Sequence, residues 1–360
     1  MLKRDIAKMN ASETLGVGKL KNIDVQARSV FYDTTYYRNE MYYISYRAGK
    51  EGIWRSSDYG NTWKHVLHLD GVQGIDYRGL WKNKNGLGFI WTAGGNLVRT
   101  TPNLTPAESF TDMYHPLSIT NGIDEDPSKN LIMYAEYGGT TGINGKRIWK
   151  STDNGASWQV AHEDQTIGHW HTCQRDPYTG YWYATSGDSG YGIKVIQSKD
   201  DGVTWQTLAE NSQEYRLCGF GFTEEYIIWA TDYSGAPAGT INLWKINKVD
   251  IEKSWDTVRI NVSNSIEGPA YGMIKTVEGR FMFWAAAENR EMSKLYLTDG
   301  VNVKEILSTN RYPNTSTLLA GFSGATKPDN NNRILLTTDS CEFGNGVYLF
   351  NIPIGLDLSK

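Results

Sequence analysis

The turn that decides the fold reads Ser151-Thr152-Asp153-Asn154-Gly155-Ala156-Ser157-Trp158. The segments 56–63 and 198–205 repeat it with the same internal spacing, so the shared pattern is Ser-x-Asp-x-Gly-x-(Thr/Ser)-Trp. This pattern predicts a hairpin turn, because Asp accepts hydrogen bonds from backbone N–H groups a few residues on and Gly supplies a positive φ. The Trp that follows can pack in the hydrophobic layer between two sheets. Three copies with one spacing indicate a repeat protein.

The distance between the copies predicts the architecture. The Trp that ends each copy stands at position 63, 158 or 205, so successive copies lie 95 and 47 residues apart, or about two periods and one. Degenerate copies occupy 97–105 and 295–300. A period in the mid-forties is typical of a β-propeller with four strands in each blade. The pattern predicts an all-β chain with about seven blades, six being the alternative.

The ends of the chain suggest how the ring closes. The last predicted blade has strands near 317–323, 333–338 and 346–351 and then little chain. We therefore expect residues 14–23 to supply its fourth strand, which would leave no free sheet edge. Residues 1–13 are interpreted as an N-terminal attachment arm. No linker interrupts the sequence, so residues 1–360 are expected to form a single propeller domain.

Composition narrows the class of partner. The net charge is −4 and acids and bases are interspersed, which argues against nucleic acid as a ligand. Three cysteines give neither a disulfide framework nor a metal-binding spacing. No apolar run reaches the roughly 18 residues of a membrane span, and no secretory signal is visible at the start. We expect an extracellular or virion-associated protein without a cofactor.

The three turns resemble the Asp-box (BNR) repeats of sialidase-like propellers. That resemblance implies the propeller fold, Asp-box turns of structural importance, and a ligand site away from those turns. It implies function only as a class, since such propellers include glycoside hydrolases, polysaccharide lyases and non-catalytic binders. The sialidase pattern itself is not matched, because Arg28-Ser29-Val30 stands where sialidases carry Arg-Ile-Pro.

Strand alternation predicts which side chains meet on the face opposite the turns. The start of the first strand and the end of the second strand of every blade lie on that face, near the centre of the ring. Acids recur at the ends of the second strands, and cationic or aromatic side chains occupy the starts of the first strands. The acids are Glu136, Asp188, Asp232, Glu288 and Asp339, and the others are Arg28, Arg47 (at a strand-two end), Arg78, His169, His171, Arg216 and Tyr271.

His169-Trp170-His171 is the most distinctive local feature. Residues two apart in a strand face the same side, so the two imidazoles are expected to project together and Trp170 to point away. Such a pair suits a general base or two metal ligands. We expect no metal, because the sequence names no third or fourth ligand. Asp188, at the end of the next strand, is the expected partner of His171.

Two classes of function fit these residues. The first is a glycan-cleaving enzyme on an extracellular or cell-surface polysaccharide. Hydrolysis would use a carboxylate pair from Asp188, Asp232 and Glu288; elimination would use His171 or Tyr271 for proton transfer. The arginines, with Glu136, Asp339, His169 and Trp170, would bind the sugar. The second is a non-catalytic propeller that binds a glycan or a receptor, as on a phage tail. Oligo- or polysaccharide is the expected partner in both.

Overall fold

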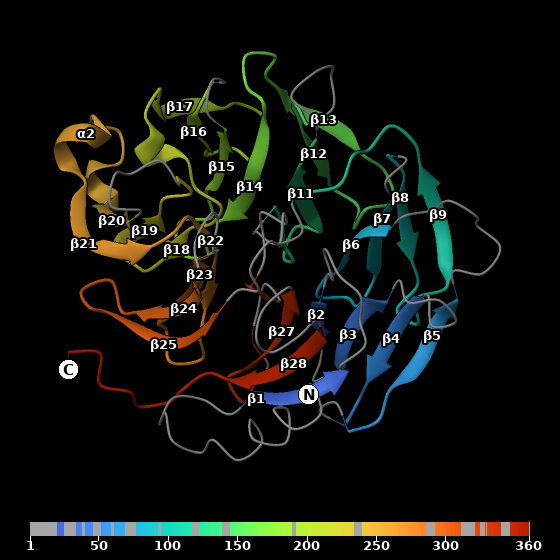
Figure 1. Cartoon of the computed structure of the whole chain (residues 1–360). Helices are drawn as coiled ribbons and strands as arrows, with labels where there is room; N and C mark the ends of the chain where they lie inside the picture. The colour runs from blue at the N-terminus through green and yellow to red at the C-terminus, as the bar shows by residue number, and fades with distance from the viewer. Residues whose placement is uncertain are drawn as a thin grey trace.

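A computed structural model describes 16 segments of the chain. They are 20–24, 34–37, 40–45, 52–58, 61–68, 77–92, 95–116, 122–138, 145–188, 192–233, 240–285, 292–310, 321–324, 328, 330–339 and 346–359. Within them the strands form seven four-stranded antiparallel sheets, which Figure 1 shows arranged around a common centre. The prediction of an all-β fold built from four-stranded sheets is confirmed.

Sheets 1 to 4 take their strands in chain order. Sheet 1 contains β2 (Thr34–Tyr37), β3 (Glu40–Ser45), β4 (Gly52–Ser56) and β5 (Lys64–His68). Sheet 2 contains β6 (Tyr77–Lys82), β7 (Gly88–Thr92), β8 (Leu97–Thr100) and β9 (Pro106–Phe110). Sheet 3 contains β10 (Ile123–Asp126), β11 (Leu131–Ala135), β12 (Arg147–Ser151) and β13 (Gln159–Glu163). Sheet 4 contains β14 (His169–Arg175), β15 (Trp182–Gly187), β16 (Lys194–Ser198) and β17 (Gln206–Glu210).

Sheets 5 and 6 continue the pattern, and sheet 7 changes it. Sheet 5 contains β18 (Gly221–Phe222), β19 (Tyr226–Ala230), β20 (Thr240–Asn247) and β21 (Ile260–Glu267). Sheet 6 contains β22 (Ala270–Lys275), β23 (Phe281–Ala285), β24 (Met292–Thr298) and β25 (Val303–Asn310). Sheet 7 contains β26 (Gly321–Gly324), β27 (Arg333–Asp339), β28 (Gly346–Asn351) and β1 (Leu20–Asp24). Strand β1 thus pairs across the whole length of the chain, with Leu20 opposite Phe350.

Helix is confined to single turns in the described segments. Two 3-10 turns, Gln213–Tyr215 and Lys248–Asp250, and the short helix α2, Trp255–Val258, all border sheet 5. None is long enough to cross a membrane.

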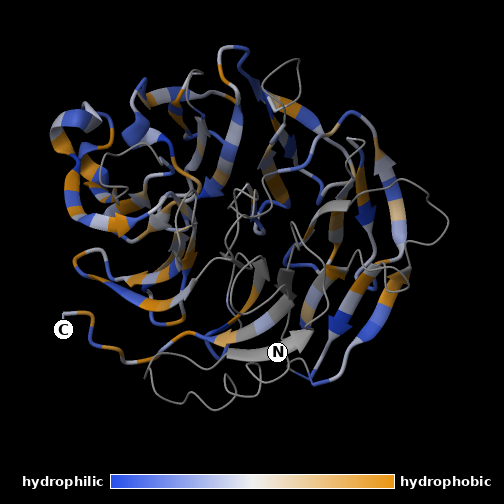
Figure 2. Ribbon diagram, in the orientation of Figure 1, coloured by the Kyte–Doolittle hydropathy of each residue, from blue (hydrophilic) through white to orange (hydrophobic). Residues whose placement is uncertain are grey.

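The hydrophobic core lies between neighbouring sheets. The second strands β7, β11 and β23 are almost continuously apolar and are buried along their whole length, because each sheet packs against two others. Figure 2 shows hydrophobic residues spread over the strands around the ring. Between sheets 2 and 3, the Trp91 and Tyr134 rings meet edge to face with centroids 5.4 Å apart. Between sheets 4 and 5, Tyr183 packs in one cluster with Phe220 and Trp229. The strand tryptophans at 81, 91, 182, 229 and 284 are all buried.

Each of the three repeated turns contains the same pattern of hydrogen bonds. In the middle copy, the Asp153 carboxylate accepts from the Ser157 backbone N–H at 2.9 Å, the Ser157 hydroxyl at 2.6 Å and the Ser151 hydroxyl at 2.8 Å. Asp58 and Asp200 make the equivalent bonds in their own turns. Each network links two strands of one sheet at its edge.

The turn glycines also fix the contact with the preceding sheet. Gly155 has φ +80°, and a Cβ there would lie 2.2 Å from the Phe89 ring of sheet 2. Gly202 has the same φ, and a Cβ there would lie 2.9 Å from Met133 of sheet 3. Glycine is required at both positions for its backbone conformation and for its lack of a side chain.

Candidate functional site

The first two strands of sheet 4 place His169 and Asp188 at the edge opposite the repeated turn. His169 begins β14 and lies across from Gly187, the last residue of β15. At the other end of β15, Trp182 pairs with Ser198, the first residue of the turn. The pairing register therefore separates the two features by the length of the sheet, as the sequence predicts.

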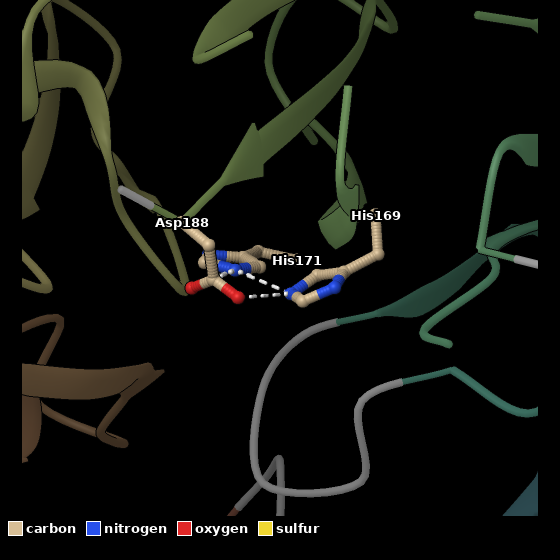
Figure 3. Close-up of side chains that lie close together, drawn as sticks. All are labelled: His169, His171 and Asp188. Carbon is tan, nitrogen blue, oxygen red and sulfur yellow. Dashed lines mark hydrogen bonds and ion pairs between the residues drawn. The ribbon is translucent and has the colours of Figure 1, made fainter. Parts of the chain in front are cut away.

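Two imidazoles and one carboxylate converge at this edge (Figure 3). The Nε2 atoms of His169 and His171 are 3.2 Å apart. Oδ2 of Asp188 lies 3.3 Å from Nε2 of His169, and Oδ1 lies 3.8 Å from Nε2 of His171. Both imidazoles are 3% exposed, whereas the Asp188 side chain is 34% exposed, so the cluster opens to solvent on the carboxylate side.

Sheet 5 supplies the other half of the cluster. The Arg216 guanidinium binds Asp188 at 3.1 Å and Asp232 at 3.3 Å. Oδ2 of Asp232 lies 3.8 Å from Nδ1 of His171. The Cys218 thiol donates to Oδ2 of Asp232 at 3.4 Å and lies 3.5 Å from the same imidazole nitrogen. One arginine therefore connects the carboxylates of two sheets.

Burial sets the protonation of this cluster. It lowers the pKa of His169, against the opposing effect of Asp188, and lowers the pKa of His171 further, aided by His169 and Arg216. Burial alone would lower the pKa of Arg216, but Asp232 and Asp188 outweigh it and the net shift is upward. Burial and then Asp232 raise the pKa of the Cys218 thiol. Near neutral pH the imidazoles are therefore neutral and the guanidinium is charged.

Two tyrosines adjoin the cluster. The Tyr137 ring stacks obliquely on His169, with centroids 4.3 Å apart. Burial, followed by the charge of Asp188, raises the pKa of Tyr137, so its hydroxyl keeps its proton. Tyr271, at the start of β22, is 6% exposed and close enough for its charged form to influence Arg216. Each tyrosine is a potential proton donor.

The backbone around Asp188 is built for close approach. A Cβ on Gly187 would lie 2.5 Å from the His171 ring and 3.0 Å from Arg216. Asp188 itself has φ +95°, a conformation that costs energy in any residue with a side chain. His171 lies at a bulge in the β14–β15 pairing, a device that re-aims a side chain.

Two of the predicted site residues lie in the core instead of the cluster. Trp170 is fully buried, and its indole donates to the Lys146 carbonyl at 2.9 Å, so its ring offers no face to a sugar. Glu136 is also fully buried, and its carboxylate accepts from Trp149 at 2.6 Å and forms an ion pair with Arg147 at 3.0 Å. Burial raises the pKa of Glu136 against those hydrogen bonds.

The remaining predicted residues are placed only in part or not at all. Arg78 lies in β6 and Asp339 ends β27, but their side chains are outside the description. Arg28, Arg47 and Glu288 lie outside the described residues.

Sequence reasoning missed Tyr137 and Cys218. Tyr137 was detectable by strand phase: it lies six residues after the first residue of β11, just as Asp188 and Asp232 lie six after the first residues of β15 and β19. Residues an even number apart share a face, so the position equivalent to Asp188 is Tyr137, and Glu136 points the other way. Nothing in the sequence distinguishes Cys218 from a buried apolar residue.

Two overlapping groups have the donor atoms and spacing to hold a metal ion. They are His169, His171 and Asp188, and His171, Cys218 and Asp232. The first is partly open, whereas the second is buried throughout.

Comparison with known proteins settles the fold. No family model and no curated protein matches the sequence. Among solved structures, a GH74 enzyme from Niastella koreensis matches with TM-score 0.62 and 17% identity, over 92% of this chain and 53% of that one. The chain thus spans about half the length of that enzyme. The oligogalacturonate lyase of Vibrio parahaemolyticus matches with TM-score 0.58 and 10% identity, over 96% of each chain.

The chain folds as a β-propeller. A third structure of this fold, YCF48 from Cyanidioschyzon merolae, matches with TM-score 0.54 and 13% identity, over 94% of this chain and 99% of that one. These three propellers are a GH74 enzyme, a lyase and a protein whose name indicates no enzyme. The structural similarity therefore shows the fold of this chain and not its activity.

Proposed function

We propose that this protein is a carbohydrate-active propeller that cleaves a glycan at the His169–His171–Asp188–Arg216 cluster. The observation that carries the proposal is the convergence of two neutral imidazoles, a charged guanidinium and the protonated Tyr137 at one partly open edge. Perturbed groups of this kind gather at catalytic sites more often than at scaffold positions. A polysaccharide-cleaving role fits an extracellular or virion-associated protein.

The geometry favours elimination on an acidic sugar over hydrolysis. Elimination needs a cation opposite the sugar carboxylate, an acceptor for the ring proton and a donor for the leaving oxygen. Arg216 suits the first role if a sugar carboxylate displaces the partly exposed Asp188 from it, the imidazoles suit the second, and Tyr137 suits the third. Hydrolysis needs two carboxyl groups free to act on either side of the bond. Asp188 and Asp232 are both bound to Arg216 instead.

The same proposal covers the finer architecture. We propose that the seven sheets are the seven blades of one propeller domain, that β1 closes the ring, and that the three turns place the chain among Asp-box propellers. Support comes from the pairing of β1 with β28 and from the shared hydrogen-bond network of the turns.

The test is a degradation screen on uronate-containing polysaccharides and on neutral ones. Products are separated by chromatography and followed by near-ultraviolet absorbance, which marks the unsaturated sugar that elimination leaves. We expect unsaturated products from an acidic polymer and none from a neutral one. Arg216→Lys and Tyr137→Phe should each lower kcat/KM by about 100-fold or more, as loss of a transition-state contact or of proton transfer does.

A matched control is Tyr178→Phe, because Tyr178 lies in the turn at the far end of β14 and should leave kcat/KM unchanged. Saturated products that disappear when Asp188 is substituted would show that the enzyme hydrolyses the bond and does not eliminate across it. If the protein binds a glycan on an array but does not cleave it, the protein is a glycan-binding propeller and not an enzyme.

A further inference from the structure

We propose that His169, His171 and Asp188 form a binding site for a divalent first-row transition-metal ion. The sequence named Asp188 only as a partner of His171, and the fold brings its carboxylate close to both imidazoles. Two imidazoles and one carboxylate are the donor set of catalytic zinc sites and of related iron sites.

The distances between the donor atoms match shared coordination. Zinc bonds to imidazole nitrogen are about 2.0–2.1 Å long, and those to carboxylate oxygen about 2.0–2.2 Å. Two nitrogens 3.2 Å apart would then subtend an angle of about 100° at the ion, near the tetrahedral value. The 3.3 Å separation of His169 Nε2 and Asp188 Oδ2 gives a similar angle. The carboxylate oxygen nearest to His171 Nε2 is Oδ1, at 3.8 Å, so the Asp188 carboxylate would have to shift toward His171 for one ion to contact both imidazoles and Oδ2.

The local charge favours a cation. Asp188 and Asp232 contribute two negative charges and Arg216 one positive charge, which leaves a formal charge of −1 on the group. Arg216 contacts Oδ1 of Asp188, while Oδ2 faces His169. The guanidinium thus orients the carboxylate without taking the oxygen that would bind the ion. A divalent ion would make the group cationic and suited to an acidic ligand.

Outer contacts hold the ligands as metal sites require. Asp232 and Cys218 lie beside Nδ1 of His171, the position where metal-bound histidines commonly meet a carboxylate. The positive φ of Asp188 and the missing side chain of Gly187 bring the carboxylate back over the imidazoles. Because Asp188 is partly exposed, the remaining coordination positions face solvent. This is the open arrangement of a catalytic site.

This inference rests on the cluster itself and not on the proposed glycan cleavage. With an ion bound, the imidazoles serve as ligands, and the proton acceptor in the proposed reaction becomes the water on the ion. Metal binding is measured without glycan, so a protein that binds the ion and cleaves nothing refutes only the proposed function. A protein that cleaves glycan after full chelation, and binds no ion, refutes only the metal site.

The experiment is calorimetric titration of the chelator-treated protein with Zn²⁺ and Co²⁺, with Mg²⁺ and Ca²⁺ as comparison ions. We expect one equivalent of Zn²⁺ or Co²⁺ to bind, and no comparable binding of the other two, because imidazole disfavours them. His169→Ala and Asp188→Asn should remove this binding, and Asp232→Asn should weaken it by about 10–100-fold. His162→Ala is the control, since it removes an imidazole outside the cluster and should bind like the wild type.

The variants count only if their metal-free thermal unfolding matches that of the wild type. A second readout needs no variant: Zn²⁺ should shift the imidazole nitrogen resonances of two of the six histidines. Absence of one-equivalent binding would overturn the proposal. Binding that persists in His169→Ala, or resonance shifts at other histidines, would do the same.

Discussion

Asp188 shows at the scale of one residue how a strained backbone serves a site. Its φ of +95° is unfavourable for a residue with a Cβ, yet it turns the carboxylate toward His169 and Arg216. A glycine would adopt this conformation without strain, but it would lack the carboxylate that contacts His169 and Arg216.

The two variants Asp188→Gly and Asp188→Ala separate the cost of the positive φ from the contribution of the carboxylate contacts. Both remove the carboxylate, but only alanine retains the backbone penalty, so the glycine variant should be more stable by roughly 1 kcal/mol. Chemical denaturation measures the difference in the free energy of unfolding. Both variants should lose glycan cleavage. Equal stabilities would show that the backbone relaxes and that the positive φ stores no strain.

At the scale of the element, the repeated turn is a unit of stability. In each copy a carboxylate gathers two hydroxyls and a backbone N–H from its own turn, and these bonds lower the pKa of the acid. For Asp153, burial acts against this shift and the hydrogen bonds from Ser157 outweigh it. In sheet 4 the turn lies at the edge opposite the cluster, so we expect the turns to contribute to stability and not to the site.

Asp153→Ala should lower the free energy of unfolding by about 1–3 kcal/mol, because the Ser151 and Ser157 donors lose their acceptor. A folded-state pKa below the unfolded value of about 3.9 gives stability that is present above that pH and lost as the pH falls through the native pKa. The wild type should therefore lose more stability on acidification than the variant does. Denaturation from pH 6 to pH 3 measures this.

Glycan cleavage serves as the control for Asp153→Ala. Since the turn is a sheet length away from His169, kcat/KM at neutral pH should equal that of the wild type. A large fall in kcat/KM with an intact fold would place part of the site at the turn face.

At the scale of the whole molecule, the first and last parts of the chain meet in one sheet. Strand β1 pairs with β28 along Leu20–Asp24 and covers what would otherwise be an unpaired edge. An exposed edge strand pairs readily with other chains. The pairing of β1 with β28 therefore leaves β28 without a free edge.

Deletion of residues 1–24 should lower the Tm and promote aggregation, because β28 loses its outer partner. Deletion of residues 1–13 is the matched control, and it should unfold at the temperature of the full chain. Thermal unfolding and size-exclusion chromatography measure both effects. An unchanged Tm in the longer deletion would show that β1 contributes nothing to the stability of sheet 7.

The cluster also depends on the whole molecule, since it joins two sheets. His169, His171 and Asp188 come from sheet 4, while Arg216 and Asp232 precede and follow the first two strands of sheet 5. The packing between these sheets, with Tyr183 against Phe220 and Trp229, sets the distance between the two halves. Substitutions in this packed layer should therefore affect the site without touching it.

The sequence by itself determined the all-β fold, the four-stranded sheets and the edge on which the His169 cluster lies. Each of these features depends on a pattern that can be counted along the sequence: turn residues at fixed offsets, the repeat period, and the alternation of side chains along a strand. The approach of Asp188 to the histidine pair belongs to the same class, because β14 and β15 are adjacent strands of one sheet, although the carboxylate lies nearer His169 than the expected partner His171.

Other members of the cluster were not predicted. Tyr137 and not Glu136 faces the cluster, because a one-residue difference in strand phase moves a side chain to the opposite face, and this phase could have been counted in the sequence. Trp170, which was expected to bind the sugar, lies instead in the core, where its large ring helps to fill the layer between sheets. The contact of Arg216 with Asp188 and that of Cys218 with His171 arise from the packing of sheet 5 against sheet 4, a geometry that no local stretch of sequence contains.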